Sequence, residues 1–195
     1  MPPPRALQDA GSDQIVVCGN LQDADLWCST GMTLPITTGP RSHRGFMDLL
    51  ATADVLVTSP GLTTLLEAGA LGVPTVCLPP RNLTQIFNGD RFARSVGDQC
   101  RIRWPADVID LEAPEQARLD GEEAGLAFIA AALRGCEPEA FAPWLQEGVA
   151  GALASAQGPR DWHALTNAAG AGGTRHVASM LRELAFERQT TSMMV

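Results

Sequence analysis

Residues 46–94 read FMDLLATADVLVTSPGLTTLLEAGALGVPTVCLPPRNLTQIFNGDRFAR. Within this stretch, an apolar, β-branched run at 53–59 is followed by a Pro-Gly break, a helical pattern at 62–71 and a second apolar run at 74–80. Gly72 comes directly after the helical pattern, where glycine commonly ends a helix. Strand, turn, helix and strand in this order predict a right-handed crossover between two parallel strands.

The flanking sequence extends this βαβ unit on both sides. Upstream, residues 14–18 and 34–37 predict two more short strands, and a further short strand is expected at 100–103. Amphipathic patterns downstream predict three helices, at 119–133, 139–156 and 174–188. The fold class that follows is α/β, a Rossmann-like parallel sheet flanked by helices, with a helical C-terminal extension.

The chain divides into three regions by composition. Residues 1–13 contain three consecutive prolines among polar residues, which is typical of a leader or linker, so we expect packed structure to begin after them. We assign residues 14–111 to the Rossmann-like core and residues 112–195 to a helical C-terminal region. A length of 195 residues fits one α/β domain of ordinary size.

Charge and hydropathy exclude several classes of function. The 22 acidic residues outnumber the 14 basic ones, and a net charge of −8 disfavours binding to nucleic acid. No apolar run approaches the roughly 18 residues of a membrane span, and the first residues lack the apolar segment of a signal peptide. We therefore expect a cytoplasmic protein.

The cysteines predict neither a metal site nor a disulfide framework. They are odd in number, widely spaced and without a CxxC pair: Cys18, Cys28, Cys77, Cys100 and Cys136. We expect reduced, buried thiols and no bound metal. The three histidines have no spacing typical of a metal site or a catalytic triad, although the loop that carries His43 should border the candidate site.

The candidate site lies where the two strands of the βαβ unit end, beyond Val57 and beyond Leu78, because these loops should face one crevice. At the first loop, a glycine turn and hydroxyl groups open a helix, and free helix N–H groups favour an anion such as a diphosphate. The residues concerned are Ser59, Gly61, Leu62, Thr63 and Thr64. Glu67 follows in the same helix, and its carboxylate can accept hydrogen bonds from both vicinal hydroxyls of a ribose.

The second loop carries a polar cluster after its two prolines. Its members are Arg81, Asn82, Thr84, Gln85 and Asn88. Amide side chains both donate and accept hydrogen bonds, which suits the recognition of a sugar. The four tryptophans are scattered, and we expect them to pack in the core or at an interface.

Together these motifs resemble the nucleotide-sugar glycosyltransferases of GT-B architecture, in particular the branch of the peptidoglycan UDP-N-acetylglucosamine transferase. The matching elements are Gly45-Phe46-Met47-Asp48, Ala53–Ser59, Gly61–Thr64, Glu67, Ala70–Pro74 and Gln85–Asn88. Two further runs, at 79–88 and 103–105, are similar to the cytosylglucuronate synthases. The resemblance covers residues 14–110 and the closing GAGGTRHVASMLREL, and it leaves 112–165 unmatched.

The resemblance implies a single donor-binding domain of the GT-B C-terminal type, with a UDP-sugar as substrate and no other cofactor. It implies that residues 61–64 hold the diphosphate and that Glu67 binds the ribose. The other implied contacts are backbone groups of Phe46 and Met47 at the uracil, Gln85 and Asn88 at the transferred sugar, and Arg41 or Arg44 at the diphosphate.

The expected function is the transfer of a sugar from a UDP-sugar, with helix-end amides stabilising the departing diphosphate. Such enzymes bind the acceptor in a second domain, so we expect that half to come from a separate acceptor-binding domain or subunit, and we name no catalytic base. Two alternatives stay open. One is a noncatalytic Rossmann-like subunit that completes or regulates a separate transferase, and the other is an epimerase of the same architecture.

Overall fold

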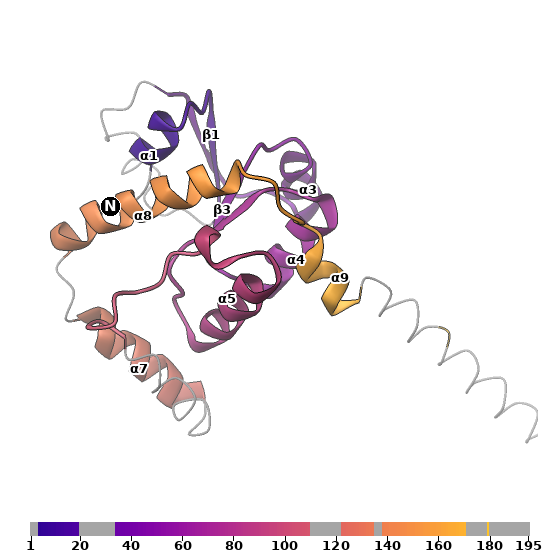
Figure 1. The fold of residues 1–195 in the computed structure, drawn as a ribbon. Coiled ribbons are helices and arrows are strands. Elements are labelled where there is room, and N and C mark those ends of the chain that lie inside the picture. Colours follow the sequence, from indigo (N-terminus) through magenta and orange to yellow (C-terminus); the bar gives the residue numbers. More distant parts are fainter. Residues whose placement is uncertain (1–3, 20–33, 110–121, 135–137, 171–178, 180–195) are drawn as a thin grey trace, which may run out of the picture.

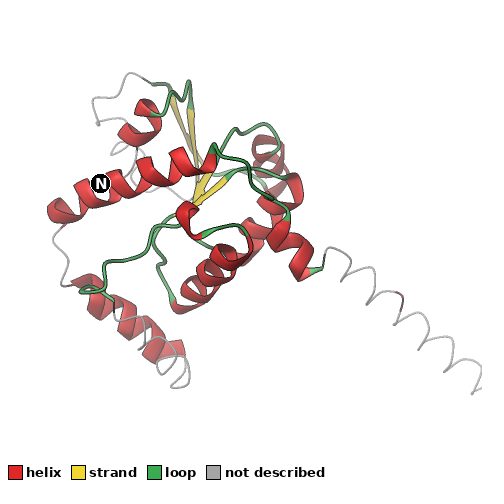
Figure 2. Cartoon of the chain, viewed as in Figure 1, coloured by secondary structure: helices red, strands yellow, loops and turns green. Residues whose placement is uncertain are grey.

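The computed structural model describes residues 4–19, 34–109, 122–134, 138–170 and 179. These residues form a mixed α/β arrangement in which short parallel strands are flanked by helices (Figures 1 and 2). The strands are β1 (Ile15–Cys18), β2 (Ile36–Gly39), β3 (Leu56–Thr58) and β4 (Thr75–Cys77). The helices are α1 (Pro4–Asp9), α3 (His43–Leu50), α4 (Leu62–Leu71), α5 (Leu83–Ser95), the 3-10 helix η1 (Asp98–Cys100), α7 (Glu122–Arg134), α8 (Pro138–Ala156) and α9 (Ala164–Ala169).

The strands form two parallel pairs. β1 pairs with β2 from Ile15 opposite Ile36, and β3 pairs with β4 from Leu56 opposite Thr75. A single parallel bridge joins Cys77 to Arg101 on the other edge of β4. The predicted parallel strands are therefore confirmed, although the described ladders are two short pairs and the strand expected at 100–103 is reduced to η1 and this bridge.

The βαβ unit forms as the sequence predicts. Helix α4 has the predicted bounds, and Gly72 ends it at φ 70°, a left-handed conformation that favours glycine. Helices α7 and α8 lie within one to three residues of their predicted ranges. The strand expected at 34–37 lies two residues later, and the helix expected at 174–188 lies outside the described residues.

The expectation that packed structure begins after residue 13 is wrong. Helix α1 begins at Pro4. Proline is tolerated at this position, because the N–H group that it lacks would have no partner within the helix. Ala6 is buried in the main core, Leu7 packs against that core, and α1 lies along α8 (Figure 1). Burial of Ala6 and packing of Leu7 therefore hold this six-residue helix against the core and α8.

The main core joins elements from most of the described chain. Leu65 of α4, Val76 of β4 and Phe92 of α5 meet the buried face of α8, which contributes Val149 and Leu153. Helix α8 therefore covers the β3–β4 pair from outside the βαβ unit, and it runs across the strands in Figure 1. This burial of apolar side chains fixes α4, whose N-terminal end carries the candidate site.

Helix α9 packs against the C-terminal half of α4. The Thr166 hydroxyl donates a hydrogen bond to the Leu66 carbonyl at 3.0 Å, and His163 Nδ1 lies 2.7 Å from the Gly69 carbonyl. A Cβ on Gly72 would lie only 2.8 Å from His163 Nε2. The close approach of the two helices therefore depends on small residues along this face of α4.

Candidate functional site

The N-terminal end of α4 is open. Within the described part of the chain, no side chain caps this helix, whereas Ser42 caps α3 and Asn82 caps α5. Leu62, the first helical residue, is 39% exposed, and Thr63 is also exposed. Since the first N–H groups of a helix have no acceptor within it, this end has the chemistry of an anion-binding site.

Gly61 at this end is not required by the fold itself. Its φ of −72° and ψ of 128° are accessible to any residue. A Cβ built there would lie 3.9 Å from its nearest neighbours, Ser59 O and Thr64 Oγ1, which is ordinary van der Waals contact. The absence of a side chain leaves the backbone accessible, as close approach of a ligand would require.

Helix α5 holds the turn that leads into α4. Asn88 is buried, and its Nδ2 donates a hydrogen bond to the Pro60 carbonyl at 3.1 Å. The neighbouring Gly89 lies against Arg101, since a Cβ there would be 3.3 Å from Arg101 Cδ, whereas its 3.6 Å distance from the Pro60 ring would be ordinary van der Waals contact. This bond joins α5 to the turn before α4, and the expectation that the loops after β3 and β4 face one crevice stays a prediction. The amide nitrogen of Asn88 is used within the protein, and its contact with a sugar stays a prediction.

Glu67 is paired with His43 across two helices. His43 Nε2 lies 2.7 Å from Glu67 Oε1, and the side chains are 75% and 19% exposed, respectively. His43 is the first residue of α3, so it lies in a helix and not in a loop as expected, and it contacts the candidate-site residue Glu67. The pairing itself was not predicted, since no spacing rule relates residues that are 24 positions apart.

Phe46 and Met47 anchor α3 against α4. Both side chains are half-buried and pack against Leu50, Ala68 and Val73. This small cluster places the beginning of α3, with His43, beside the second turn of α4. The implied contact of their backbone groups with uracil stays a prediction.

Gln85 takes part in the capping of α5. Its Oε1 accepts the Arg81 N–H at 2.7 Å, while the Asn82 side chain accepts the Gln85 N–H at 2.9 Å. This reciprocal pair resembles a capping box, which fixes the entry of the chain into the helix. A sugar contact of Gln85 stays a prediction and would have to share this oxygen or use the side-chain nitrogen.

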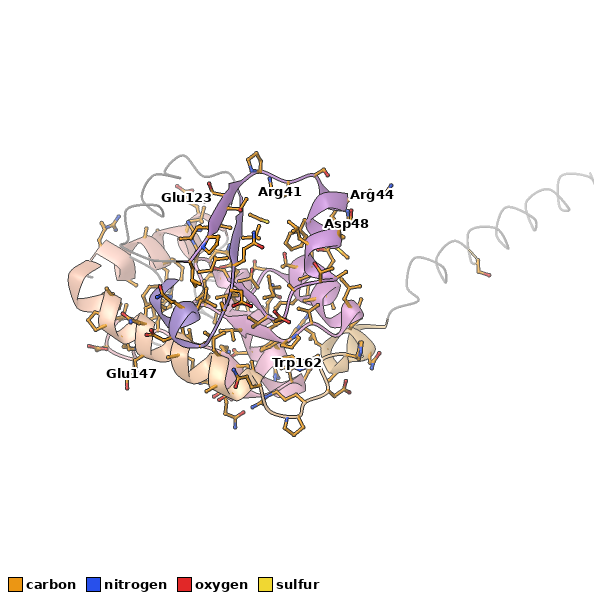
Figure 3. The ribbon with its side chains drawn as sticks, turned by 90° about the horizontal axis from the view of Figure 1, so that it is seen from above. Arg41, Arg44, Asp48, Glu123, Glu147 and Trp162 are labelled. Atoms are coloured by element: carbon orange, nitrogen blue, oxygen red, sulfur yellow. The ribbon has the colours of Figure 1, made fainter. Side chains whose placement is uncertain are left out.

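Two arginines flank His43 at the start of α3. Arg41 and Arg44 are both exposed, and Figure 3 shows them at one end of β2 and α3, with Arg44 directed outward. Among the described residues, neither arginine forms an ion pair with a carboxylate. Two exposed positive charges thus lie at this end of α3, with exposed Asp48 on the same helix (Figure 3), although the whole chain carries a net charge of −8.

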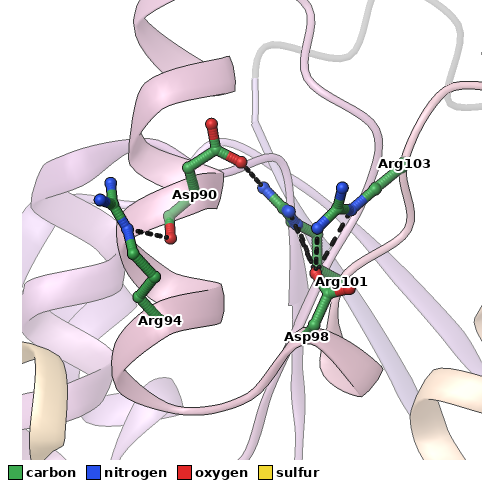
Figure 4. A network of polar contacts seen from close by, with 5 residues as sticks. All are labelled: Asp90, Arg94, Asp98, Arg101 and Arg103. Carbon is green, nitrogen blue, oxygen red and sulfur yellow. Dashed lines mark hydrogen bonds and ion pairs between the residues drawn. The ribbon is translucent and has the colours of Figure 1, made fainter. Parts of the chain in front are cut away.

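A second polar network fixes α5 to the end of β4 (Figure 4). The Arg101 side chain is only 7% exposed, and its guanidinium group bonds to Asp90 and Asp98. Arg103 Nη2 also donates to Asp98, at 2.9 Å. These contacts stabilise the segment beside β4 and were missed, because the four arginine and aspartate positions carry no motif.

The network lowers the pKa of the Asp98 carboxyl below its ordinary value of 3.8. Partial burial alone would raise this pKa, but hydrogen bonds from Arg103 and Arg101, with their positive charges, outweigh it. A carboxyl whose pKa is lowered on folding stabilises the folded protein fully at pH values above its unfolded-state pKa. This contribution is lost as the pH falls through the pKa of the folded state.

We therefore expect Asp98→Asn to lower the free energy of unfolding at pH 7 by less than about 1 kcal/mol, since half-exposed ion pairs contribute little. The deficit should shrink below pH 4 and vanish once the wild-type carboxylate is protonated. Urea unfolding of both proteins between pH 7 and about pH 2.5 measures this. A deficit that is independent of pH would contradict the role of the charge.

The described cysteines are free, and two of the three are buried. Burial raises the pKa of the Cys77 thiol to about 12, although the Arg101 charge opposes it, so this thiol stays protonated. Cys100 is likewise buried, which confirms the expectation for these two, whereas Cys18 is exposed and departs from it. Cys28 and Cys136 lie outside the described residues.

No group of three or more histidine, cysteine, aspartate or glutamate side chains in the described ranges is arranged to hold a metal ion. Within the same ranges, no helix combines the length and the hydropathy that a membrane span requires.

Comparisons with protein-family models, with curated proteins and with solved structures found no match. The class of protein therefore follows from the described geometry: an α/β protein, broadly Rossmann-like, with short parallel strand pairs flanked by helices. Its candidate site combines the open end of α4, the Glu67–His43 pair and the exposed arginines at the start of α3.

Proposed function

We propose that this chain is the donor-binding domain of a UDP-sugar-dependent glycosyltransferase of GT-B architecture, acting with a separate acceptor-binding domain or subunit. The observation that carries the proposal is that one helix, α4, holds two groups that suit two neighbouring parts of a nucleoside diphosphate. The open, hydroxyl-bearing first turn of α4 suits a diphosphate, and Glu67, one turn further, suits a ribose.

The spacing of these groups fits one nucleotide. Thr63 and Glu67 are four residues apart, so they share a face of α4 and are separated by about 6 Å along its axis. Ribose and diphosphate are directly linked in a nucleoside diphosphate. A single ligand lying along this face can therefore reach both the helix end and the carboxylate.

The charge around the site supports a ligand with negative phosphates. Arg41 and Arg44 are exposed beside His43, and the positive end of the α4 macrodipole adds to their field. In sugar transfer, charge develops on the departing diphosphate, and oriented backbone N–H groups stabilise that charge without having to reorganise. Activation of the acceptor hydroxyl is assigned to the partner domain.

The test is calorimetric titration of the protein with UDP. We expect wild-type binding that Glu67→Ala weakens by about 1.5 kcal/mol, which is about tenfold, because ribose hydroxyls lose their acceptor. Glu147→Ala is the matched control, since Glu147 is an exposed glutamate on α8, away from the arginine pair (Figure 3). It should leave the affinity unchanged.

Two results would overturn parts of the proposal. If the wild-type protein does not bind UDP, the donor-site assignment is wrong as a whole. If Glu67→Ala and Glu147→Ala bind UDP as tightly as wild type, the nucleotide does not contact Glu67, and the ribose assignment is removed.

A further inference from the structure

Resting on the proposed function, we infer that His43 is the positioning residue for Glu67. It holds the carboxylate with one oxygen engaged and the other directed to the ribose. The site thereby becomes selective for ribonucleotides over 2′-deoxyribonucleotides.

The geometry of the pair supports this role. His43 Nε2 lies 2.7 Å from Glu67 Oε1, and the contact joins the first residue of α3 to the second turn of α4. Among the described residues, Glu67 Oε2 has no hydrogen-bond partner. A carboxylate oxygen accepts up to two hydrogen bonds, so the second oxygen keeps enough capacity for two vicinal hydroxyls.

The contact between His43 and Glu67 contributes little to the stability of the fold. The His43 side chain is 75% exposed, and polar contacts at exposed positions contribute little to the free energy of unfolding. The N-terminus of α3 is capped independently, because Ser42 Oγ accepts the Gly45 N–H at 3.1 Å. The cluster of Phe46 and Met47 against α4 also fixes α3 without His43.

The pair contributes more to ligand binding than to folding. An unrestrained glutamate side chain loses rotamer freedom when a ligand orders it, and a neighbour that orders it beforehand removes this loss. A fixed carboxylate also discriminates more sharply, because it is aligned with both hydroxyls of a ribose and loses one partner in a 2′-deoxyribose. A carboxylate free to rotate adapts to either sugar.

The neighbouring cations have a different role. Arg41 and Arg44 flank His43 on the same segment, but neither bonds to Glu67. Their charge acts on phosphate groups, which UDP and 2′-deoxy-UDP share. An effect of His43 on binding of the ribose can therefore be separated from an effect of local positive charge on binding of the phosphates.

The experiment compares UDP with 2′-deoxy-UDP by calorimetry at one pH. We expect wild-type protein to prefer UDP by about tenfold, the equivalent of one hydrogen bond to a charged group. His43→Ala should weaken UDP binding by about fivefold and leave 2′-deoxy-UDP nearly unchanged, so that the preference falls to about twofold. His43→Gln, whose amide still donates a hydrogen bond, should restore most of the preference.

Arg44→Ala is the matched control on the same helix. It should weaken both nucleotides by the same factor and retain the preference, because the phosphates are common to both. Thermal unfolding of His43→Ala should match that of wild type, which separates a loss of positioning from a loss of folding.

The outcomes distinguish the two proposals. If UDP binds and depends on Glu67, but His43→Ala keeps the preference, weakens both nucleotides equally or strengthens UDP binding, the role of His43 is refuted and the donor site stands. If wild-type protein binds neither nucleotide, the proposed function and this inference both fail.

Discussion

Gly69→Ala is expected to lower the free energy of unfolding by about 3 kcal/mol, although alanine is normally the better residue in a helix. A Cβ at this position would overlap the Thr166 hydroxyl and lie 3.2 Å from the Trp162 carbonyl oxygen. Thr166 is β-branched, and its hydroxyl is already bonded to the Leu66 carbonyl, so it cannot turn aside freely. Helix α9 must then move away from α4.

The matched control is Gly151→Ala in the middle of α8. Outside its own stretch of helix backbone, no described atom lies within 4 Å of a Cβ built there, so this variant should gain about 0.5 to 1 kcal/mol from helix propensity alone. Urea unfolding at neutral pH measures both changes. Opposite signs are expected, and two stabilised variants would show that α9 does not lie this close to α4.

A combined variant, Gly69→Ala with Thr166→Ala, tests the cause of the first effect. Removing the hydroxyl removes the worst overlap, so the pair should be less destabilised than the sum of the single changes. Additive effects would mean that the Thr166 hydroxyl is not the obstacle. Because α9 holds the C-terminal half of α4, Gly69→Ala should also weaken UDP binding at the opposite end of that helix.

Trp104→Ala is expected to be comparably destabilising, by about 3 kcal/mol. The Trp104 ring stacks on Trp144 and meets Phe141 edge-on, with all centroid distances at 5.6 Å. Its indole N–H donates a 2.7 Å hydrogen bond to the Pro80 carbonyl. The substitution therefore removes a half-buried ring from an aromatic cluster and releases the loop that leads to the cap of α5.

Trp104→Phe separates the two contributions. The smaller ring keeps much of the aromatic packing but cannot donate to Pro80, so we expect a loss of only about 1 to 1.5 kcal/mol. Chemical unfolding followed by circular dichroism compares the variants without relying on the fluorescence of the residue that is replaced. If phenylalanine were as damaging as alanine, the hydrogen bond to the loop would dominate over ring packing.

Local patterns were sufficient to predict the central elements. Helix α4 and its end at Gly72 were predicted to the residue, because helical periodicity and a left-handed glycine are both set by neighbours within a few positions. The ends of the short strands were placed within three residues for the same reason. Helix α1 was missed, since Ala6 becomes a core residue only when α8, far along the chain, packs on it.

The sequence by itself determined which chemical groups gather at the strand ends: hydroxyls and Gly61 before α4, Glu67 within it, and amide side chains before and in α5. Short-range geometry decides these positions, because a strand followed by a helix always places the helix N-terminus at the same sheet edge. Tertiary structure alone decided the partners, joining His43 to Glu67, Asn88 to Pro60 and Thr166 to Leu66. These contacts span 24 to 100 residues, and burial of apolar faces brings such groups together without any local signal in the sequence.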